Sequence, residues 1–392
     1  MNTPDPLFFL IAGEASGDLL GARLMQALKK KTNGAVRFAG IGGPRMQEEG
    51  IDLFFSQTEL AHFGLFELLR HIPHILKRIK QTVAKIRHMR PAALITIDAP
   101  DFCFRVAKQL KGEGIPLIHY VAPSVWFWRP GRAKKIARFL DHLLALLPFE
   151  PPYFTREGLP CTFVGHSIIE SGAEKGDAHR FRTKYNITPD ATLLTVLPGS
   201  RTSEISRLMP VFKQTVAILH KQHPNLRVVI PTISNFADRL RIQSQDWATP
   251  VTIVQGDADK YDALAASRAA LACSGTVSVE LAMASLPSLT AYKINWLTAM
   301  LYRPFVKMTY VNLVNIMHNH MVVPEMLQTN CTPKKLAATI DELMSDGAAR
   351  QKQIQKLSEV ALWLGQGQFV PSKRAAEVIM DTINLRKELQ AA

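Results

Sequence analysis

Short apolar runs alternate with longer segments of helical periodicity along most of this 392-residue sequence. Uninterrupted apolar runs are typical of strands that are buried on both faces of a parallel sheet. In the first half they occupy Leu7–Ala12, Val36–Ile41, Ala92–Ile97, Leu117–Val121 and Leu143–Leu147. Between them, segments such as Leu19–Lys31 and Phe102–Lys111 carry apolar residues at helical spacing. This alternation predicts a doubly wound α/β domain.

A second set of strands begins after the stretch 164–177, which contains Gly, Ser and His. We expect these strands at Leu193–Leu197, Arg227–Pro231, Thr252–Val254, Ala269–Ala272 and Ser288–Ala291. We therefore predict two Rossmann-like domains that face each other across a cleft. Residues 1–170 form the first, to which C-terminal helices return at 371–392, and residues 171–370 form the second. Ligands of this architecture bind beyond the carboxyl ends of the strands.

Composition narrows the choice of partners. The chain has 47 Lys and Arg against 33 Asp and Glu, a formal net charge of +14. This excess favours an anionic partner: nucleic acid, a phosphorylated ligand or an acidic membrane surface. The four cysteines are isolated in the sequence, which is typical of thiols in a reduced compartment and argues against a zinc site. No apolar stretch is long enough to cross a bilayer, so we expect a cytosolic or membrane-surface protein.

Candidate acid and base residues follow two of the predicted strands. The first strand runs into a G-E-A-S-G-D turn, in which Ser16 or Asp18 can cap the next helix and Glu14 has no evident structural task. A later strand ends at Asp98, which would point toward the cleft, whereas Asp101 resembles a helix cap. A carboxylate at a strand end can act as general base on an alcohol when its neighbours hold or desolvate it. We favour Asp98 as the base and keep Glu14 as the alternative.

Aromatic and polar loops are candidates for an acceptor or sugar site. Trp126 and Trp128 stand next to Arg129, and they either pack under the domain interface or line a site for a lipid chain or sugar ring. A polar loop pair farther on could hydrogen-bond a sugar. The acceptor and sugar candidates are Ser16, Trp126, Trp128, Arg129, Asn315, Glu325 and Gln328.

Two loops in the second half are typical of a nucleotide diphosphate site. A Gly-Ser turn at a helix start can hold an anion with backbone N–H groups, and a following arginine adds a bidentate donor. A later Ser-Gly-Thr loop also opens a helix, with a glutamate one turn inside that can accept from ribose hydroxyls. The residues are Gly199, Ser200, Arg201, Ser274, Gly275, Thr276 and Glu280. A D-x-D pair at Asp257 and Asp259 is interpreted as a helix cap.

A basic, amphipathic segment lies between the second and third predicted strands of the first half. No acidic residue occurs between Glu67 and Asp98, and apolar residues recur at helical spacing before and after Pro73, which we expect to break the helix. The segment is either a solvated basic face over a buried stripe or a surface that dips into anionic lipid. Nucleic acid is disfavoured because no recognition motif accompanies the charge. The membrane-surface candidates are Phe63, Phe66, Leu69, Arg70, Lys77 and Arg78.

Taken in order, these motifs resemble those of the lipid-A-disaccharide synthase family, inverting glycosyltransferases of the two-domain GT-B fold. The resemblance runs from G-E-A-S-G-D at 13–18 through A-P-S-V-W-F-W-R at 122–129, L-P-G-S-R at 197–201 and S-G-T at 274–276 to V-P-E-M-L-Q at 323–328. It covers nearly the whole chain. Phe127 departs from the pattern, because a small residue is expected between the tryptophans.

The resemblance implies a reaction. UDP-2,3-diacylglucosamine would donate its sugar to 2,3-diacylglucosamine 1-phosphate, giving a β-1,6 disaccharide 1-phosphate and UDP in lipid A biosynthesis, without metal or other cofactor. Asp98 would take the acceptor proton, and Arg201 with the helix after Ser274 would stabilise the departing UDP. The first domain would then serve the acceptor on the inner face of the inner membrane, and the second would bind the UDP-sugar donor.

The sequence leaves two alternative functions and the oligomeric state undecided. A UDP-sugar epimerase uses the same fold but has no need of a lipid-facing basic helix. The second alternative is a non-catalytic membrane-surface protein that binds nucleotides, in which Asp98 would have no catalytic role. A returning C-terminal helix could also exchange between the protomers of a homodimer.

Overall fold

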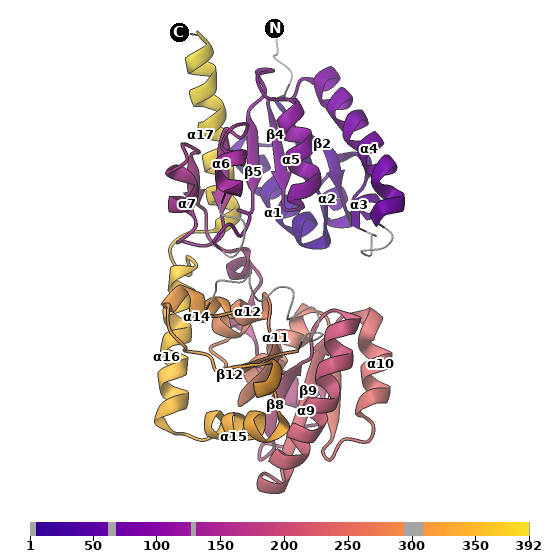
Figure 1. Ribbon diagram of the computed structural model, residues 1–392, viewed down its shortest axis with the longest axis vertical. Coiled ribbons are helices and arrows are strands. Elements are labelled where there is room, and N and C mark those ends of the chain that lie inside the picture. Colours follow the sequence, from indigo (N-terminus) through magenta and orange to yellow (C-terminus); the bar gives the residue numbers. More distant parts are fainter. Residues whose placement is uncertain (1–4, 62–67, 127–130, 294–308, 392) are drawn as a thin grey trace. The chain divides into compact units, whose positions relative to one another are not determined.

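The computed structural model describes residues 5–61, 68–126, 131–293 and 309–391. The chain divides into two compact units (Figure 1). Unit 1 consists of residues 1–167 and 368–392, and unit 2 consists of residues 168–367. Each unit contains one parallel sheet with helices on both faces, the arrangement typical of a doubly wound α/β domain.

The described part of unit 1 contains a seven-stranded parallel sheet in the order β3-β2-β1-β4-β5-β6-β7. The strands are β1 (Leu7–Ala12), β2 (Arg37–Gly42), β3 (Asp52–Ser56), β4 (Ala93–Ile97), β5 (Leu117–Tyr120), β6 (His142–Ala145) and β7 (Cys161–Phe163). The sequence pattern missed β3 and β7. Both are edge strands, and their residues are mostly only partly buried, so they lack the uniformly apolar signal of the inner strands.

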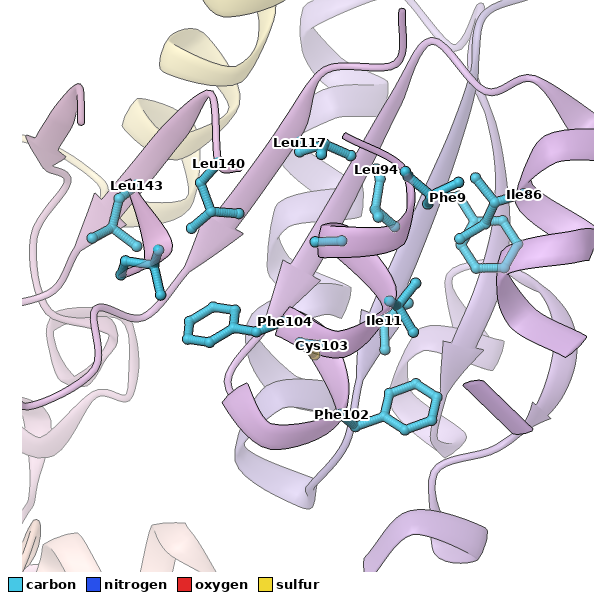
Figure 2. Packing of buried hydrophobic residues seen from close by; sticks show 14 of the residues in the cluster. Phe9, Ile11, Ile86, Leu94, Phe102, Cys103, Phe104, Leu117, Leu140 and Leu143 are labelled. Atoms are coloured by element: carbon cyan, nitrogen blue, oxygen red, sulfur yellow. The ribbon is translucent and has the colours of Figure 1, made fainter. Parts of the chain in front are cut away.

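Helices cover both faces of this sheet. They are α1 (Ala15–Lys31), α2 (Pro44–Glu48), α3 (Thr58–Ala61), α4 (Leu68–Met89), α5 (Pro100–Gln109), α6 (Arg132–Ile136), α7 (Pro151–Thr155) and α17 (Pro371–Ala391). Phe9 and Ile11 of β1 belong to the core beneath α4 and α5, which Figure 2 shows from close by. Phe8 and Leu10 belong to the core on the opposite face, beneath α1 and α17. Burial on both sides explains why the strand carries no polar alternation.

The last helix of the chain belongs to unit 1. Ala375, Ala376, Ile379 and Ile383 of α17 are buried in the same core as the inward side of α1. The chain therefore leaves unit 1 after β7 and returns to it at its end. The boundary near residue 167 lies close to the one expected from the sequence.

The described part of unit 2 contains a six-stranded parallel sheet in the order β10-β9-β8-β11-β12-β13. The strands are β8 (Thr192–Leu197), β9 (Leu226–Thr232), β10 (Val251–Gln255), β11 (Ala269–Cys273), β12 (Ser288–Tyr292) and β13 (Glu325–Leu327). The α-helices are α8 (Ala178–Lys184), α9 (Thr202–Gln222), α10 (Ser234–Ser244), α11 (Asp257–Ala266), α12 (Val277–Met283), α14 (Leu313–His318), α15 (Pro333–Met344) and α16 (Ala348–Trp363). Short 3₁₀ segments are η1 (Ser167–Glu170), η2 (Ala173–Lys175) and η3 (Gln328–Asn330).

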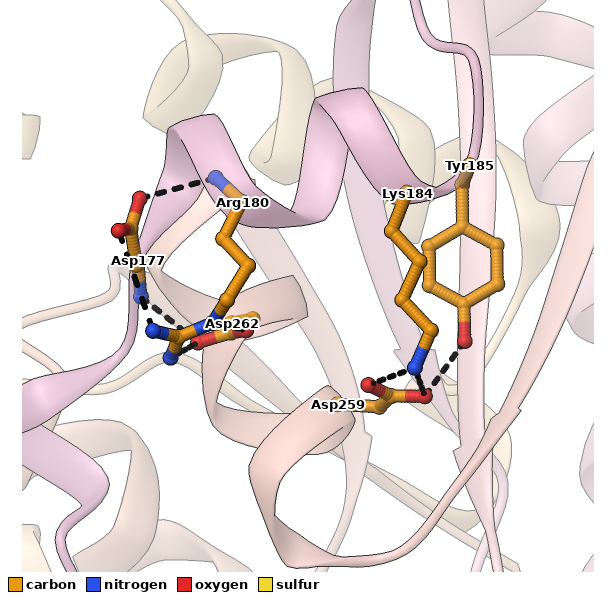
Figure 3. Close-up of polar contacts among 6 residues, drawn as sticks. All are labelled: Asp177, Arg180, Lys184, Tyr185, Asp259 and Asp262. Atoms are coloured by element: carbon orange, nitrogen blue, oxygen red, sulfur yellow. Dashed lines mark hydrogen bonds and ion pairs between the residues drawn. The ribbon is translucent and has the colours of Figure 1, made fainter.

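Ion pairs tie α8 to α11 (Figure 3). The Arg180 guanidinium binds both oxygens of the buried Asp262 carboxylate at 2.5 and 2.6 Å. Asp259 accepts from the Lys184 ammonium and the Tyr185 hydroxyl. The sequence-based interpretation of the D-x-D pair as a helix cap was therefore wrong for Asp259, which holds a neighbouring helix, and the N-cap of α11 is Gly256.

Candidate functional site

The two carboxylates considered for the base lie at the ends of neighbouring strands in unit 1. β1 and β4 pair in parallel up to Ala12 and Ile97, so the turn after β1 and the residues after β4 are adjacent. Ser16 Oγ donates to Asp98 Oδ2 at 3.5 Å. Glu14 is exposed and occupies the N-cap position of α1 without a capping side-chain bond. The structure thus brings Ser16 and Asp98 together, with Glu14 on the same turn.

The backbone beyond β4 has an unusual conformation. Asp98 and Ala99 have φ values of +52° and +42°, in the left-handed region, and Val121 just after β5 has a φ of +83°. Such angles are rare for non-glycine residues, above all for a β-branched one, and each costs about 1–3 kcal/mol. The Asp98 N–H donates to Tyr120 O at 3.0 Å, which fixes the peptide. Backbone strain of this kind is concentrated at functional sites.

Two helix caps expected from the sequence are absent. Neither Ser16 nor Asp18 caps α1, because the N-cap residue is Glu14. Asp18 is buried instead, and its carboxylate accepts three backbone N–H groups around the start of α2 at 2.8–3.0 Å. Asp101 lies inside the first turn of α5, whose N-cap is Ala99, and its side chain is 97% exposed. Asp18 therefore has a structural role, and Asp101 does not cap.

The loop after β5 is held by a buried carboxylate. Trp126 Nε1 donates to Glu150 Oε1 at 3.2 Å, and its ring lies edge-to-face with Phe149 at 5.3 Å. Glu150 is 3% exposed, and its burial raises its pKa to about 7. Trp126 is partly buried and makes these contacts within unit 1. Trp128 and Arg129, like the divergent Phe127, lie outside the described residues.

The Gly-Ser turn after β8 differs from the expectation. Ser200 and Arg201 were expected to hold an anion with backbone N–H groups, but both groups donate to Glu204 Oε2, at 3.1 and 3.3 Å. An internal carboxylate thus occupies the position expected for a phosphate. Gly199 lies against it with a φ of +111°. The Arg201 side chain is 76% exposed, so its guanidinium remains accessible to a ligand.

The second loop lies at the end of β11, beside β8 in the sheet. Ser274 Oγ donates to Val311 O at 3.4 Å, whereas Gly275 and Thr276 are exposed, and a Cβ built on Gly275 would meet no atom within 4 Å. Glu280, one turn inside α12, accepts from Lys260 Nζ at 3.0 Å. Burial lowers the pKa of Lys260, but Glu280, Tyr261 and Asp257 together outweigh this effect, so the pKa ends above its usual range.

The polar loop before β13 uses its side chains internally. Asn315 is fully buried, and its amide accepts the N–H groups of Val322 and Val323 and donates to Val323 O and Glu325. Glu325 also accepts the backbone N–H groups that precede α14. The expectation that Asn315 contacts a sugar does not match this structure, because its amide is buried and bonded within the protein. Gln328 is half-buried and has a φ of +49°.

Comparison with known proteins decides the family. The family described as lipid-A-disaccharide synthetase matches residues 8–379. The chain belongs to the lipid-A-disaccharide synthase family. The family member from Rhodospirillum centenum is 56% identical over 97% of this chain and 95% of its own length. That from Paramagnetospirillum magneticum is 48% identical over 97% of this chain and 99% of its own length. A lipid-A-disaccharide synthase is a glycosyltransferase, and the enzyme class expected from the sequence is thereby confirmed.

Solved structures show the fold that this lipid-A-disaccharide synthase family member adopts. The glycotransferase of kitacinnamycin has a TM-score of 0.64 at 15% identity, over 97% of this chain and all of its own. UDP-GlcNAc 2-epimerase from Neisseria meningitidis, solved with UDP-GlcNAc, has a TM-score of 0.62 at 12% identity, over 96% and 99% of the two chains. At such identities the likeness concerns the fold alone. It confirms the GT-B class of two Rossmann-like domains.

The basic segment of this lipid-A-disaccharide synthase family member forms α4 in part. Phe63 and Phe66 lie outside the described residues, and so do the side chains of Leu69 and Arg70. Lys77 is exposed, but Arg78 is half-buried and binds Glu59, with Nε at 2.9 Å from Oε2. Arg78 is therefore not the open cation that we expected.

The inward face of α4 belongs to the core of unit 1. Ile79, Val83 and Ile86 are buried, so this part of the apolar stripe packs against the sheet. Pro73 was expected to break the helix, but α4 continues through it. Within the part of the chain that the structure describes, no helix has the length and apolarity to cross a membrane.

Metal and thiol chemistry receive no support from the described side chains. Among them, no group of three or more His, Cys, Asp and Glu residues is placed to hold a metal ion. The free cysteines are Cys103, Cys161, Cys273 and Cys331, and burial raises the pKa of each thiol. A raised pKa keeps a thiol protonated and poorly reactive near neutral pH.

Three polar residues that bind candidate site residues were not predicted from the sequence. Glu204 was not among the candidate residues, although its spacing of three from Arg201 on a helix start is a capping signal. Glu150 precedes two prolines in an apolar stretch, and no sequence signal shows that it is buried under Trp126. Lys260 comes from α11 and meets Glu280 only through the fold.

Proposed function

We propose that the protein transfers 2,3-diacylglucosamine from UDP-2,3-diacylglucosamine to the 6-hydroxyl of 2,3-diacylglucosamine 1-phosphate. The products are the β-1,6 disaccharide 1-phosphate and UDP. The observation that carries this proposal is membership of the lipid-A-disaccharide synthase family along nearly the full chain. An epimerase is disfavoured, because the likeness to epimerases is confined to the fold.

Asp98 is the proposed general base. As the acceptor oxygen bonds to the anomeric carbon and the bond from that carbon to the UDP oxygen breaks, Asp98 takes the hydroxyl proton. One displacement of this kind inverts the anomeric configuration. Two observations support the assignment. The backbone is strained at Asp98 and Ala99, as is common at functional sites, and the Ser16 hydroxyl hydrogen-bonds the Asp98 carboxylate. Glu14 remains the alternative base.

Unit 2 is proposed to bind the UDP moiety of the donor. The exposed Arg201 guanidinium provides N–H donors for the diphosphate and stabilises the charge that develops on departing UDP. The exposed loop at Gly275 and Thr276 lets backbone approach the ligand closely. Glu280, held by Lys260, is proposed to accept from the ribose hydroxyls.

Unit 1 is proposed to meet the lipid acceptor on the inner face of the inner membrane. Lys77 and Lys80 are exposed on α4, and Leu76 beside them is 43% exposed. Exposed cations beside an apolar side chain are suited to an anionic lipid surface. Phe63, Phe66, Leu69 and Arg70 would extend this surface, and the loop with Trp126, Trp128 and Arg129 would contact the acceptor. Assembly as a homodimer remains a proposal.

Product analysis tests the reaction. Purified protein is mixed in detergent with UDP-2,3-diacylglucosamine and 2,3-diacylglucosamine 1-phosphate, with EDTA present, and the products are identified by mass spectrometry. We expect a disaccharide phosphate and UDP. Conversion of the UDP-sugar to an isomer of equal mass, resolved by chromatography, would instead indicate an epimerase. If the protein binds UDP but leaves both substrates unchanged, it is a non-catalytic binding protein.

A further inference from the structure

The turn between β8 and α9 is built around the carboxylate of Glu204. Its Oε2 accepts the backbone N–H groups of Ser200 and Arg201, and its Oε1 accepts from Arg201 Nη1 at 2.7 Å. The Glu204 side chain is 8% exposed, in contrast to the exposed side chain of Arg201. One buried carboxylate therefore binds both the backbone and the side chain of an exposed arginine.

Gly199 leaves room for this carboxylate. A Cβ at position 199 would lie 2.4 Å from Glu204 Oε2 and 2.7 Å from Glu204 Cβ, closer than real Cβ atoms approach. Any side chain there would displace the carboxylate or the turn. The glycine thus serves an internal anion, whereas glycines at helix starts more often let backbone N–H groups approach a bound phosphate.

We propose that Glu204 is a positioning residue that presents the Arg201 guanidinium to the diphosphate of the nucleotide-sugar donor. This inference rests on the proposed function and deepens it, because it assigns diphosphate recognition to a side chain in place of the turn's N–H groups. A guanidinium has five N–H donors, so the bond to Glu204 leaves donors for a ligand. Holding the long arginine side chain in advance also reduces the entropy that is lost on binding.

The strand ends nearby place protonated groups beside the ion pair. Cys273 ends β11 and Tyr292 ends β12. Burial raises the pKa of the Cys273 thiol and of the Tyr292 hydroxyl, and the Glu204 charge raises both further. The Arg201 charge lowers both pKa values, but by less. Both groups are therefore uncharged near neutral pH. The Glu204 carboxylate itself holds the pKa of Arg201 above its usual range.

A double-mutant cycle tests whether Glu204 acts through Arg201. The affinity for UDP is measured by calorimetry, and kcat and KM by the product assay, in the wild type, Glu204→Gln, Arg201→Ala and the double variant. Gln cannot accept from the turn and from the guanidinium together, because it has one acceptor oxygen. We expect Glu204→Gln to weaken UDP binding about tenfold, and the double variant to bind no worse than Arg201→Ala, because residues that act as a unit are not additive.

Two outcomes would overturn the proposal. Additive losses in the cycle would mean that Glu204 merely stabilises the turn. Tighter UDP binding in Glu204→Gln would mean that the N–H groups are the real anion site and that the carboxylate blocks them. Glu204→Asp, which keeps the charge, replaces Glu204→Gln in the cycle if the latter unfolds.

The control and the readout separate this proposal from the proposed function. Asp238→Asn removes a carboxylate from another Arg–acid pair at i,i+3 in unit 2, with an Asp238 side chain that is 90% exposed. We expect it to leave UDP affinity unchanged. UDP binding requires no turnover, so the cycle still tests Glu204 if the wild type forms no disaccharide. In that case the proposed reaction is contradicted, whereas the proposed role of Glu204 is still decided by the cycle.

Discussion

Gly13 lies directly against Ala99. A Cβ built on Gly13 would lie 2.4 Å from the Cβ of Ala99, in the segment that turns the chain just after Asp98. The close approach links the turn after β1 to the left-handed backbone after β4. We therefore expect the glycine in the first loop to help position Asp98, the proposed base on the neighbouring strand.

Gly13→Ala tests this link. The added methyl group must push Ala99 away, so we expect a loss of about 1–3 kcal/mol in unfolding free energy, as for overpacking, and at least about a tenfold loss of turnover. Urea unfolding and the product assay measure the two effects. Gly347→Ala is the control, because a Cβ there meets only Ser345 Oγ at 3.3 Å. Unchanged turnover in Gly13→Ala would show that the approach does not position Asp98.

The assignment of the base is tested by comparing Asp98→Asn with Glu14→Gln. Removal of a general base lowers turnover by about 10²–10⁴-fold, and we expect this for Asp98→Asn with little change in UDP affinity. Glu14→Gln should lose much less. The reverse ranking, with both variants folded by circular dichroism, would transfer the role to Glu14.

Glu150 predicts a pH dependence of stability. Burial raises its pKa from the ordinary 4.5 to about 7, so the native state keeps a proton that the unfolded state has released between these values. The unfolding free energy should therefore fall as pH rises from about 4.5 to about 7, by up to roughly 3 kcal/mol, and then level off.

Urea unfolding at several pH values measures this dependence. Glu150→Gln, which does not titrate, should show a flatter profile. Glu157→Gln, which changes an exposed glutamate shortly after α7, should retain the wild-type profile. Equal slopes in the wild type and Glu150→Gln would assign the pH dependence to other groups.

Asn315 is expected to stabilise unit 2. Asn315→Leu keeps the side-chain size but leaves the N–H groups of Val322 and Val323 without their acceptor. Unsatisfied buried donors cost about 1–3 kcal/mol each, so we expect a loss of about 2–5 kcal/mol in denaturant unfolding. Asn225→Leu, which removes an exposed hydrogen bond, should cost much less. Similar losses in the two variants would contradict this role.

Membrane association through α4 is tested with Leu76→Ser combined with Lys77→Glu. The double variant loses exposed apolar surface and reverses a charge, so we expect several-fold weaker binding to anionic liposomes in sedimentation assays. Leu362→Ser is the control, because Leu362 is 53% exposed on α16 in unit 2. Equal binding by the double variant and the wild type would exclude this face of α4.

Much of the fold follows from periodicity in the sequence alone. The inner strands of both sheets were predicted from uninterrupted apolar runs, because strands buried on both faces need no polar side chains. The edge strands β3 and β7 and the short β13 were not predicted, because part of each strand remains exposed and the apolar signal is weaker. The motifs at the strand ends also indicated the family, which the comparisons then confirmed.

The tertiary structure decided which polar groups are engaged within the protein. The turn at Ser200 and Arg201 has the sequence of an anion site, yet Glu204 fills it, because a helix start brings the residue three positions on back to the turn. Asn315 was expected to contact a sugar and is buried. Local sequence determines where strands end and which chemical groups stand there. The folded structure determines which of those groups still face solvent, through local contacts such as that of Glu204 and through the packing of distant segments such as those around Asn315, because each hydrogen bond made internally removes a donor or acceptor from a ligand.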